Sequence, residues 1–280
     1  MTANILDGKI LAQQIRQELK QKISLLPSSP SLAVIIVGNN PASEIYVKSK
    51  EKACFDVGIT PKTYTLDKNT SQQELLNLIN NLNNSPEING ILVQLPLPEH
   101  LDTTTILQSI NPIKDVDGFH PLNNGFLTQN TRQGYIPCTP KGIIRLIKET
   151  NQNLTGLNAV VIGRSQIVGL PIAQLLIQQN CTVTVTHSKT QKLQEICKNA
   201  DILVSAIGKP EFVTKDYIKE NAIVIDVGIN RTDNGLKGDV SYNQAKEIAQ
   251  YITPVPGGVG PMTIAMLLEN TYEAFLKQHP

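Results

Sequence analysis

The sequence predicts two α/β domains, the second a Rossmann-like doubly wound parallel sheet. Two observations lead to this fold class. Short apolar runs rich in β-branched residues alternate with segments of helical periodicity along most of the 280 residues, which is typical of strands buried between helices. A glycine-containing loop, Gly163 to Gly169, also separates one such run from a helical segment, where nucleotide-binding sheets place their phosphate loop.

The first domain is predicted to open with an amphipathic helix and to continue as alternating strands and helices. Prolines at 27 and 30 end the first helix, and Ser43 is expected to be the N-cap of the second. Strands are expected at residues 32–38, 63–66 and 90–95, and helices at residues 8–26, 46–57, 71–83 and 103–110.

The same alternation continues beyond a stretch punctuated by prolines, so we place the domain crossing near Cys138 to Pro140. Pro171 is compatible with the first turn of the helix that follows the glycine loop. Strands are expected at residues 159–162, 182–186, 202–206 and 223–227, and helices at residues 141–150, 170–179, 191–199 and 262–276.

The composition limits the classes of partner. Lysine and arginine total 25 against 24 acidic residues, a net charge of +1 without long runs of one sign, so neither a nucleic-acid groove nor a membrane surface is indicated. A small-molecule substrate is expected. The first residues lack a signal-peptide pattern and no apolar run is long enough to span a membrane, which favours a cytoplasmic location.

The cysteines give no sign of a disulfide framework or a metal site. They are far apart, without a CxxC pair or a histidine-rich cluster, and stand at Cys54, Cys138, Cys181 and Cys197. We expect four reduced thiols and no bound metal.

A lysine lies on the apolar face of the predicted helix at residues 46–57. At about 100° per residue, Lys50 falls in the middle of the apolar arc, with Tyr46 one turn before it. The arc consists of Tyr46, Val47, Ala53, Cys54 and Val57. A lone lysine in such a place often snorkels to solvent on its aliphatic stem. Alternatively, desolvation favours the neutral amine, which beside a phenol can act as a general base.

Two further polar features stand near predicted strands. Gln94 interrupts an apolar strand, where an unpaired buried amide is costly. An exposed edge strand would explain it, but contact with a ligand or with Lys50 is the favoured interpretation. The segment Lys114-Asp-Val-Asp-Gly118 places two carboxylates beside a glycine, a weak signal by itself because turns favour aspartate and glycine.

The glycine loop departs from the usual GxGxxG fingerprint. Ser165 replaces the second glycine, and the last glycine comes one residue late. About 20 residues after such a loop, an NAD-preferring fold usually has an acidic residue for the ribose hydroxyl, whereas this chain has His187, Ser188 and Lys189. With Arg164 in the loop, the site suits a 2′-phosphate, so NADP is predicted.

Six motifs taken together resemble one family. They are Tyr46-Val-x-x-Lys50, Val93-Gln-Leu-Pro-Leu-Pro98, Lys114-Asp-Val-Asp-Gly118, Pro137-Cys-Thr-Pro140, Gly163-Arg-Ser-x-Ile-Val-Gly-x-Pro171 and Pro254-Val-Pro-Gly-Gly-Val-Gly-Pro-Met-Thr263. In this order they resemble the bifunctional methylenetetrahydrofolate dehydrogenase/methenyltetrahydrofolate cyclohydrolase (FolD) family. The resemblance implies oxidation of 5,10-methylenetetrahydrofolate by NADP+ and then hydrolysis of the methenyl product to 10-formyltetrahydrofolate.

The resemblance also implies an architecture. Residues 1–139 would form the folate-binding catalytic domain, completed by a C-terminal helix at residues 262–280 that returns to it. Residues 140–261 would form the inserted NADP-binding domain, and the protein would be a homodimer. The two activities would serve tetrahydrofolate interconversion, with purine and amino-acid biosynthesis downstream.

Site residues are implied by matching positions. Lys50 would be the catalytic lysine, Tyr46 would stack on the folate ring, Gln94 would bond the lysine region, and Asp117 would hold the pterin. The cofactor residues implied are Gly163, Arg164, Ser165, Ile167, Val168, Gly169, His187, Ser188, Gly228 and Ile229. Further substrate residues implied are Leu95, Gly257, Gly258, Pro261 and Thr263.

Three alternatives remain open at the level of sequence. A shikimate-dehydrogenase-like NADP oxidoreductase would explain the second domain but not the loop at residues 254–263. A non-catalytic NADP-binding regulator would not explain Lys50 or Gln94. A monofunctional methylenetetrahydrofolate dehydrogenase would keep the family but lose one activity. The chain has no GxxxxGK[ST] loop, so no ATP-dependent formate ligase is expected.

Overall fold

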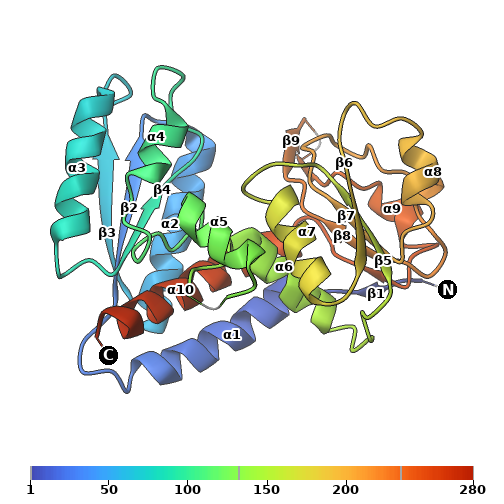
Figure 1. The fold of residues 1–280 in the computed structure, drawn as a ribbon, viewed down its shortest axis with the longest axis horizontal. Coiled ribbons are helices and arrows are strands. Elements are labelled where there is room, and N and C mark those ends of the chain that lie inside the picture. The colour runs from blue at the N-terminus through green and yellow to red at the C-terminus, as the bar shows by residue number, and fades with distance from the viewer. Residues whose placement is uncertain (1, 132, 234, 280) are drawn as a thin grey trace. The chain divides into compact units, whose positions relative to one another are not determined.

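The computed structural model describes residues 2–131, 133–233 and 235–279 and divides the chain into two compact units (Figure 1). The six-stranded unit contains Met1–Ala12 and Thr139–Thr263, and the three-stranded unit contains Gln13–Cys138 and Ile264–Pro280. The divisions fall inside three helices, α1 (Gly8–Ile23), α6 (Cys138–Lys148) and α10 (Val259–Gln278). The predicted fold class of two α/β units, with a C-terminal helix that returns to the first, is confirmed.

The three-stranded unit is built on a parallel sheet with the order β3-β2-β4. The strands are β2 (Ser31–Val37), β3 (Thr60–Leu66) and β4 (Gly90–Val93). The central strand β2 is buried along its whole length, as expected for an apolar β-branched run between two neighbours. One face of the sheet packs on α3 (Gln72–Asn84) and α4 (Thr103–Gln108), which contribute Leu75, Ile79, Leu82 and Ile106 to a common apolar core.

The helix that carries Lys50, α2 (Pro41–Val57), begins earlier than predicted. Ser43 was expected to cap it, and this is wrong, because Ser43 lies within the first turn and donates its backbone N–H to Asn40 Oδ1 at 3.2 Å. The side chain of Asn40 therefore takes the capping role, and Pro41 follows at a position where its missing N–H costs nothing. By contrast, α3 begins as predicted, with Ser71 and Glu74 forming a capping box.

The six-stranded unit has a parallel sheet with the order β1-β11-β8-β7-β5-β6. Its strands are β1 (Asn4–Ile5), β5 (Asn158–Ile162), β6 (Thr182–Thr186), β7 (Ile202–Ser205), β8 (Ile223–Asp226) and β11 (Tyr251–Ile252), and an antiparallel hairpin adds β9 (Asn230–Thr232) and β10 (Gly235–Lys237). Helices of this unit include α7 (Gly169–Gln178), α8 (Leu193–Cys197), the 3₁₀ turn η1 (Lys215–Tyr217) and α9 (Tyr242–Ala245). The buried strands β5, β7 and β8 share a core with α9.

The first twelve residues belong to the six-stranded unit rather than to the domain predicted to span residues 1–139. The reason is a short parallel pairing, in which Asn4 lies opposite Tyr251 and Ile5 opposite Ile252. A two-residue strand leaves no periodic pattern in a sequence. The closing helix α10 starts at Val259, three residues before the predicted start, and its residues from Ile264 on join the three-stranded unit.

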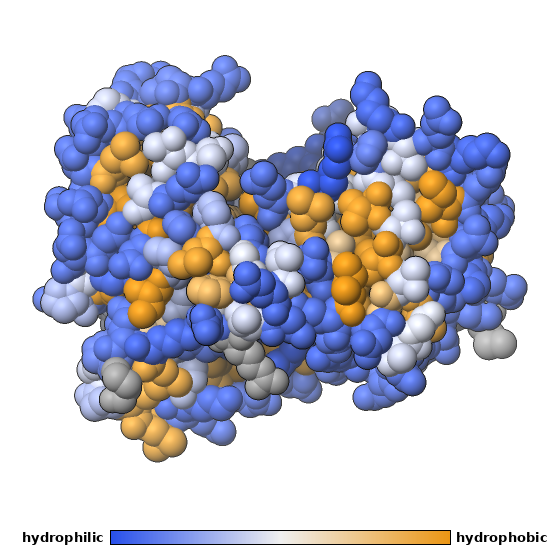
Figure 2. Space-filling view, viewed as in Figure 1, coloured by the Kyte–Doolittle hydropathy of each residue, from blue (hydrophilic) through white to orange (hydrophobic). Residues whose placement is uncertain are grey.

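Figure 2 shows one face, on which hydrophobic residues are interspersed among hydrophilic ones. Across residues 2–131, 133–233 and 235–279, none of the helices has the length and apolar character needed to cross a membrane.

Candidate active site

The three-stranded sheet has a topological switch point at its central strand. The chain leaves β2 through α2 to reach β3 on one side, and then passes through α3 to reach β4 on the other side (Figure 1). Open α/β sheets bind ligands outside the carboxyl ends of strands at such a point. The segments that follow β2 and β4 carry Lys50 and Gln94.

Lys50 and Gln94 are joined by a hydrogen bond. Lys50 Nζ donates to Gln94 Oε1 at 2.9 Å, and Gln94 Nε2 donates to the carbonyl oxygen of Leu95 at 2.7 Å. Lys50 is only 9% exposed, on the same helix face as the buried Val47 and Cys54. The predicted contact between the amide and the lysine is therefore confirmed, and the lysine does not snorkel to solvent.

The sequence predicted Gln94 inside a strand at residues 90–95, and this is wrong. β4 ends at Val93, and Gln94 follows it half-buried, with its N–H still donated to Ile35 at 2.8 Å. Pro96, which has no N–H, stops the pairing beyond this point. The position at the carboxyl end of the strand frees the amide side chain to meet Lys50.

The two acids of the Asp115 to Gly118 motif have different surroundings. Asp115 is buried and accepts hydrogen bonds from the N–H of His120 at 2.7 Å and from Asn123 Nδ2 at 2.8 Å. Asp117 is half-buried. Desolvation of its carboxyl group raises the pKa of Asp117 to about 6, although the ammonium group of Lys50 acts in the opposite direction. Asp115 thus shapes the turn, and Asp117 is the acid near the lysine.

The six-stranded sheet has its own switch point between β5 and β7. The chain runs from β5 to β6 on one side and then crosses to β7 on the other. The backbones that leave the two strands meet closely. Gly163 has φ +116°, and a Cβ at this position would clash with the carbonyl oxygen of Ala206. A Cβ at Gly169 would likewise clash with Gly163, so the loop requires both glycines.

The loop between these glycines presents its side chains outward. Ser165 Oγ accepts the N–H groups of Val168 and Gly169, each at 3.2 Å, and so holds the first turn of α7. Arg164 and Ile167 are exposed. A cradle closed to any Cβ and followed by a helix N-terminus suits a phosphate group, so the residues present fit a dinucleotide.

The segment after β6 forms a tight turn. His187 donates its N–H to Thr190 Oγ1 at 2.9 Å, and His187 Nδ1 accepts the N–H of Lys189 at 3.1 Å. Ser188 is exposed, and this turn contains no carboxylate. Its chemistry is therefore compatible with a 2′-phosphate.

Comparison with known proteins decides the family. A family model described as "Tetrahydrofolate dehydrogenase/cyclohydrolase, catalytic domain" matches residues 6–117, and one described as "Tetrahydrofolate dehydrogenase/cyclohydrolase, NAD(P)-binding domain" matches residues 137–279. The chain belongs to this family. The predicted enzyme with dehydrogenase and cyclohydrolase activities is confirmed, as is the class of nicotinamide cofactor.

Individual relatives agree with the membership. The "Bifunctional protein FolD" of Acetivibrio thermocellus is 54% identical over 98% of this chain and 97% of its own length. A crystal structure of the bifunctional FolD enzyme from Campylobacter jejuni is 49% identical, with a TM-score of 0.96 over 98% of this chain and 99% of that one. A FolD structure from Trypanosoma brucei, complexed with NADP cofactor and inhibitor, is 38% identical, with a TM-score of 0.95 over 99% of this chain and 98% of that one.

The remaining predicted residues of this family member lie in the six-stranded unit. Lys9 donates its N–H to the carbonyl oxygen of Gly257 at 3.0 Å, and Gly258 packs against the start of α1 so closely that Gly8 has no room for a Cβ. Thr263 Oγ1 lies 3.0 Å from Thr139 Oγ1. Pro261 stands in the first turn of α10. Gly257, Gly258, Pro261 and Thr263 thus belong to the six-stranded unit, and the other predicted substrate residues, Tyr46, Lys50, Gln94, Leu95 and Asp117, belong to the three-stranded unit.

Gly228 and Ile229 follow β8. A Cβ at Gly228 would clash with the side chain of Asp239, and Ile229 is 44% exposed. A Cβ at Gly260, in the first turn of α10, would lie 3.6 Å from Ile229 Cδ1. The loop after β8 therefore contacts the start of the closing helix within one unit.

Sequence reasoning missed Asn270 of α10. This residue is fully buried, and its Nδ2 donates to the carbonyl oxygens of Val116 at 2.8 Å and Ile136 at 3.0 Å. It joins the segment that carries Asp117 to the segment that carries Cys138, whose thiol also donates to Val116. Asn270 stands between Glu269 and Thr271 in α10, so the sequence gave no signal that set it apart from its polar neighbours.

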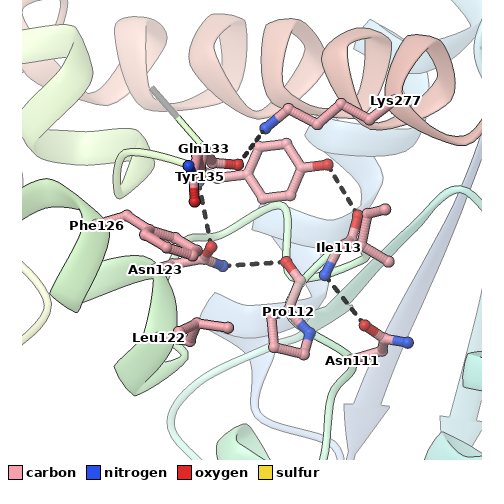
Figure 3. A pocket seen from close by; sticks show the side chains of 9 residues that line it. All are labelled: Asn111, Pro112, Ile113, Leu122, Asn123, Phe126, Gln133, Tyr135 and Lys277. Atoms are coloured by element: carbon pink, nitrogen blue, oxygen red, sulfur yellow. Dashed lines mark hydrogen bonds between the residues drawn. The ribbon is translucent and has the colours of Figure 1, made fainter. Parts of the chain in front are cut away.

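The same three-stranded unit has a separate hollow of about 450 Å³ that none of the predicted site residues line (Figure 3). It is lined by Asn111, Pro112, Ile113, Leu122, Asn123, Phe126, Gln133, Tyr135 and Lys277. Its polar groups are engaged with one another: Lys277 Nζ donates to Gln133 at 2.8 Å, and Tyr135 Oη donates to Ile113 at 2.8 Å. The hollow is therefore not the candidate active site of this family member.

Proposed function

We propose that this protein oxidises 5,10-methylenetetrahydrofolate with NADP+ and then hydrolyses the 5,10-methenyl product to 10-formyltetrahydrofolate. The three-stranded unit is assigned the folate and the six-stranded unit the dinucleotide. The observation that supports the chemistry most strongly is the hydrogen bond from the buried Lys50 to Gln94, at the switch point of the three-stranded sheet.

The oxidation needs positioning rather than a protein base. The C–H bond of the methylene bridge breaks, and its electron pair leaves as hydride while the adjacent nitrogen lone pairs form the methenyl cation. NADP+, when bound, supplies the hydride acceptor. The contribution of the protein is to hold the folate in a fixed place, which is the role assigned to Tyr46, Gln94 and Leu95.

The hydrolysis requires proton transfer. Water attacks the methenyl carbon and loses one proton. The bond from this carbon to N5 then breaks as the remaining hydroxyl proton passes to N5, which leaves the formyl group on N10. Lys50, as the neutral amine, takes the proton from the attacking water, and the hydrogen bond to Gln94 fixes its direction.

Asp117 is assigned to the pterin. A carboxylate can accept hydrogen bonds from the N–H donors of the pterin ring, and such charge-assisted bonds are stronger than neutral ones. The effect of Lys50 on the Asp117 carboxyl supports placing both groups in one site.

The choice of NADP over NAD is part of the proposal. It is supported by the exposed Arg164 and by the turn at His187 and Ser188, which presents no carboxylate to repel a 2′-phosphate. The relative from Trypanosoma brucei is described as complexed with NADP cofactor. The remaining cofactor contacts are assigned to the glycine loop and to Gly228 and Ile229. Gly257, Gly258, Pro261 and Thr263 are assigned to the border of the folate and the cofactor.

The homodimer and the cytoplasmic location also remain proposals. None of the four cysteines forms a disulfide and all four are buried, which suits a reducing compartment. Sedimentation of the purified protein tests the dimer, and a monomer at micromolar concentration would contradict it.

The test of the function is to mix the protein with 5,10-methylenetetrahydrofolate and either NADP+ or NAD+. Reduced nicotinamide and the absorbance of the methenyl product are followed separately. NADPH formation without lasting methenyl absorbance supports both activities and the cofactor assignment. Methenyl accumulation beyond spontaneous hydrolysis would leave a monofunctional dehydrogenase, and no turnover with either cofactor would contradict the proposal.

A further inference from the structure

A buried carboxylate lies behind the loops of the six-stranded sheet. Asp239 is 0% exposed. Its Oδ2 accepts the N–H of Ile207 at 2.7 Å and the N–H of Gly208 at 3.2 Å. Its Oδ1 accepts the N–H of Lys209 at 2.9 Å and the side-chain amide of Asn230 at 3.0 Å. One carboxylate thus holds the loop after β7 and the loop after β8.

A second buried acid holds the backbone of the first. Asp226, at the end of β8, accepts the N–H of Asp239 at 2.8 Å, of Val240 at 2.9 Å and of Gly228 at 3.0 Å. A Cβ at Gly228 would clash with Asp239, and a Cβ at Gly238 would clash with Asp226. Burial raises the pKa of Asp226 to about 7. The pair is therefore tightly enclosed and fixed in place from both sides.

The partners of Asp239 require a carboxylate and not merely a polar side chain. Four N–H groups and, at 3.4 Å, the hydroxyl of Ser205 all donate to it, and an acceptor-only side chain satisfies them together. An asparagine would turn an NH₂ group toward at least one of them and leave a buried donor unpaired, which is costly.

The held loops adjoin the segments assigned to the nucleotide. Ile207 follows Ala206, whose carbonyl oxygen occupies the place that a Cβ on Gly163 would need. Asn230 follows Gly228 and Ile229. Movement of Asp239 would therefore shift the glycine loop through Ala206 and the loop after β8 through Asn230.

We propose that Asp239 is a positioning residue for the nicotinamide dinucleotide, which sets the loops after β7 and β8 at the carboxyl edge of the six-stranded sheet. The inference rests on the proposed function, since it presumes that the dinucleotide binds at this edge. Asp239 does not touch the reacting atoms in this role. Its effect is on cofactor binding and not on the chemistry of Lys50.

The test is the full-length Asp239→Asn protein. The KM for NADP+ is expected to rise about tenfold or more, since a buried donor loses its acceptor. The KM for the folate and the hydrolysis of added methenyltetrahydrofolate without nucleotide are expected to stay within about twofold of the unchanged protein. In a folded variant, an equal worsening of all three quantities, with both KM values raised and the hydrolysis rate lowered, would overturn the proposal.

Asp201→Asn is the matched control. Asp201 precedes β7, at the opposite edge of the sheet, where it accepts the N–H of Asn158 at 2.8 Å and pairs with Lys219 at 2.6 Å. Its loss is expected to leave the KM for NADP+ unchanged. An equal rise in both variants would show that any lost aspartate in this unit has the same effect, and would overturn the role of Asp239.

A second variant keeps the test decisive if Asp239→Asn does not fold. Asn230→Ala removes one donor and leaves the carboxylate with its other partners. It is expected to raise the KM for NADP+ measurably, by less than the about tenfold expected for loss of the carboxylate. Where both variants fold, their effects should not add. An unchanged KM would overturn the proposal. If the unaltered protein reduces no NADP+, the proposed function fails and not this inference.

Discussion

The two units place their candidate sites at the same topological position but build them from different parts of the chain. In the three-stranded unit, the switch point presents side chains, and Lys50 Nζ lies 2.9 Å from the amide oxygen of Gln94. In the six-stranded unit, the switch point presents backbone, at Gly163 and Gly169, where a Cβ has no room. Proton transfer needs a titratable side chain, whereas a phosphate can be bound by N–H groups alone.

This difference predicts how each unit responds to substitution. Loss of a reactive side chain should remove one chemical step and leave the fold and the other ligand in place. Loss of a glycine should move the backbone and weaken binding of the cofactor without touching the proton transfer. Variants in the two units should therefore separate the two activities.

The largest effect is expected for Lys50→Met. Cyclohydrolase activity should fall by about a thousandfold, in the range found for general bases, while at least part of the dehydrogenase activity remains. Both rates are measured on the purified variant. Lys48→Met is the control, because Lys48 is exposed on the opposite face of α2, and it should change neither rate. Equal loss of both activities in Lys50→Met would mean that the lysine also positions the folate.

The next effect concerns Gly163→Ala. The added methyl group would meet Ala206 at a position where φ is +116°, so NADP+ affinity should fall about a hundredfold as the loop shifts. Isothermal titration with NADP+ measures it. Gly156→Ala is the matched control for backbone strain, because Gly156 also has a positive φ, of +81°, but has open space where a Cβ would lie. Similar loss in both variants would assign the effect to backbone strain alone.

A smaller effect is expected for Asp117→Asn, with a characteristic pH dependence. The KM for the folate should rise about tenfold, as a charge-assisted hydrogen bond is lost. The pKa of Asp117 is raised to about 6, so the carboxylate is present above this pH and is protonated below it. Folate affinity of the unchanged protein should therefore weaken as the pH falls from about 7 to about 5. The Asn variant should lack this inflection, and its persistence would remove Asp117 from the folate site.

The smallest effect is expected for Arg164→Ala. Loss of a charged partner for the 2′-phosphate should narrow the preference for NADP+ over NAD+ by about tenfold or less, because the side chain is exposed and solvent screens it. The ratio of kcat/KM for the two cofactors measures it. Arg231→Ala, an exposed arginine of β9, serves as the control. An unchanged ratio of kcat/KM for NADP+ and NAD+ in Arg164→Ala would mean that Arg164 does not contact the 2′-phosphate.

The sequence predicted the features that depend on local pattern. The buried strand β2 and the arc of α2 that contains Lys50 follow from periodicity, and Gly163 from its place between strand and helix. Features that depend on distant contacts were missed. Asn270 donates a hydrogen bond to Val116, 154 residues away, and Asp239 accepts one from Ile207, 32 residues away. Neither partner can be identified from the neighbours of these residues in the chain.

Boundaries were predicted less well where a side chain or a distant strand sets them. Asn40 rather than Ser43 caps α2, since both residue types are good caps and only the backbone decides between them. The strand at Asn4 and Ile5 exists only because Tyr251 and Ile252 offer an edge. The predictions were therefore wrong about the ends of elements and about the unit to which the first residues belong. They were right about the helix that carries Lys50 and about the place of the glycine loop.

The separation of chemistry between the units is tested most directly by the cyclohydrolase activity of Gly163→Ala, measured on added methenyltetrahydrofolate without nucleotide. The predicted result is a rate within about twofold of the unchanged protein, while oxidation of methylenetetrahydrofolate at subsaturating NADP+ falls about a hundredfold. A parallel fall of both activities would contradict it, since the backbone of the six-stranded unit would then be required for the proton transfer at Lys50.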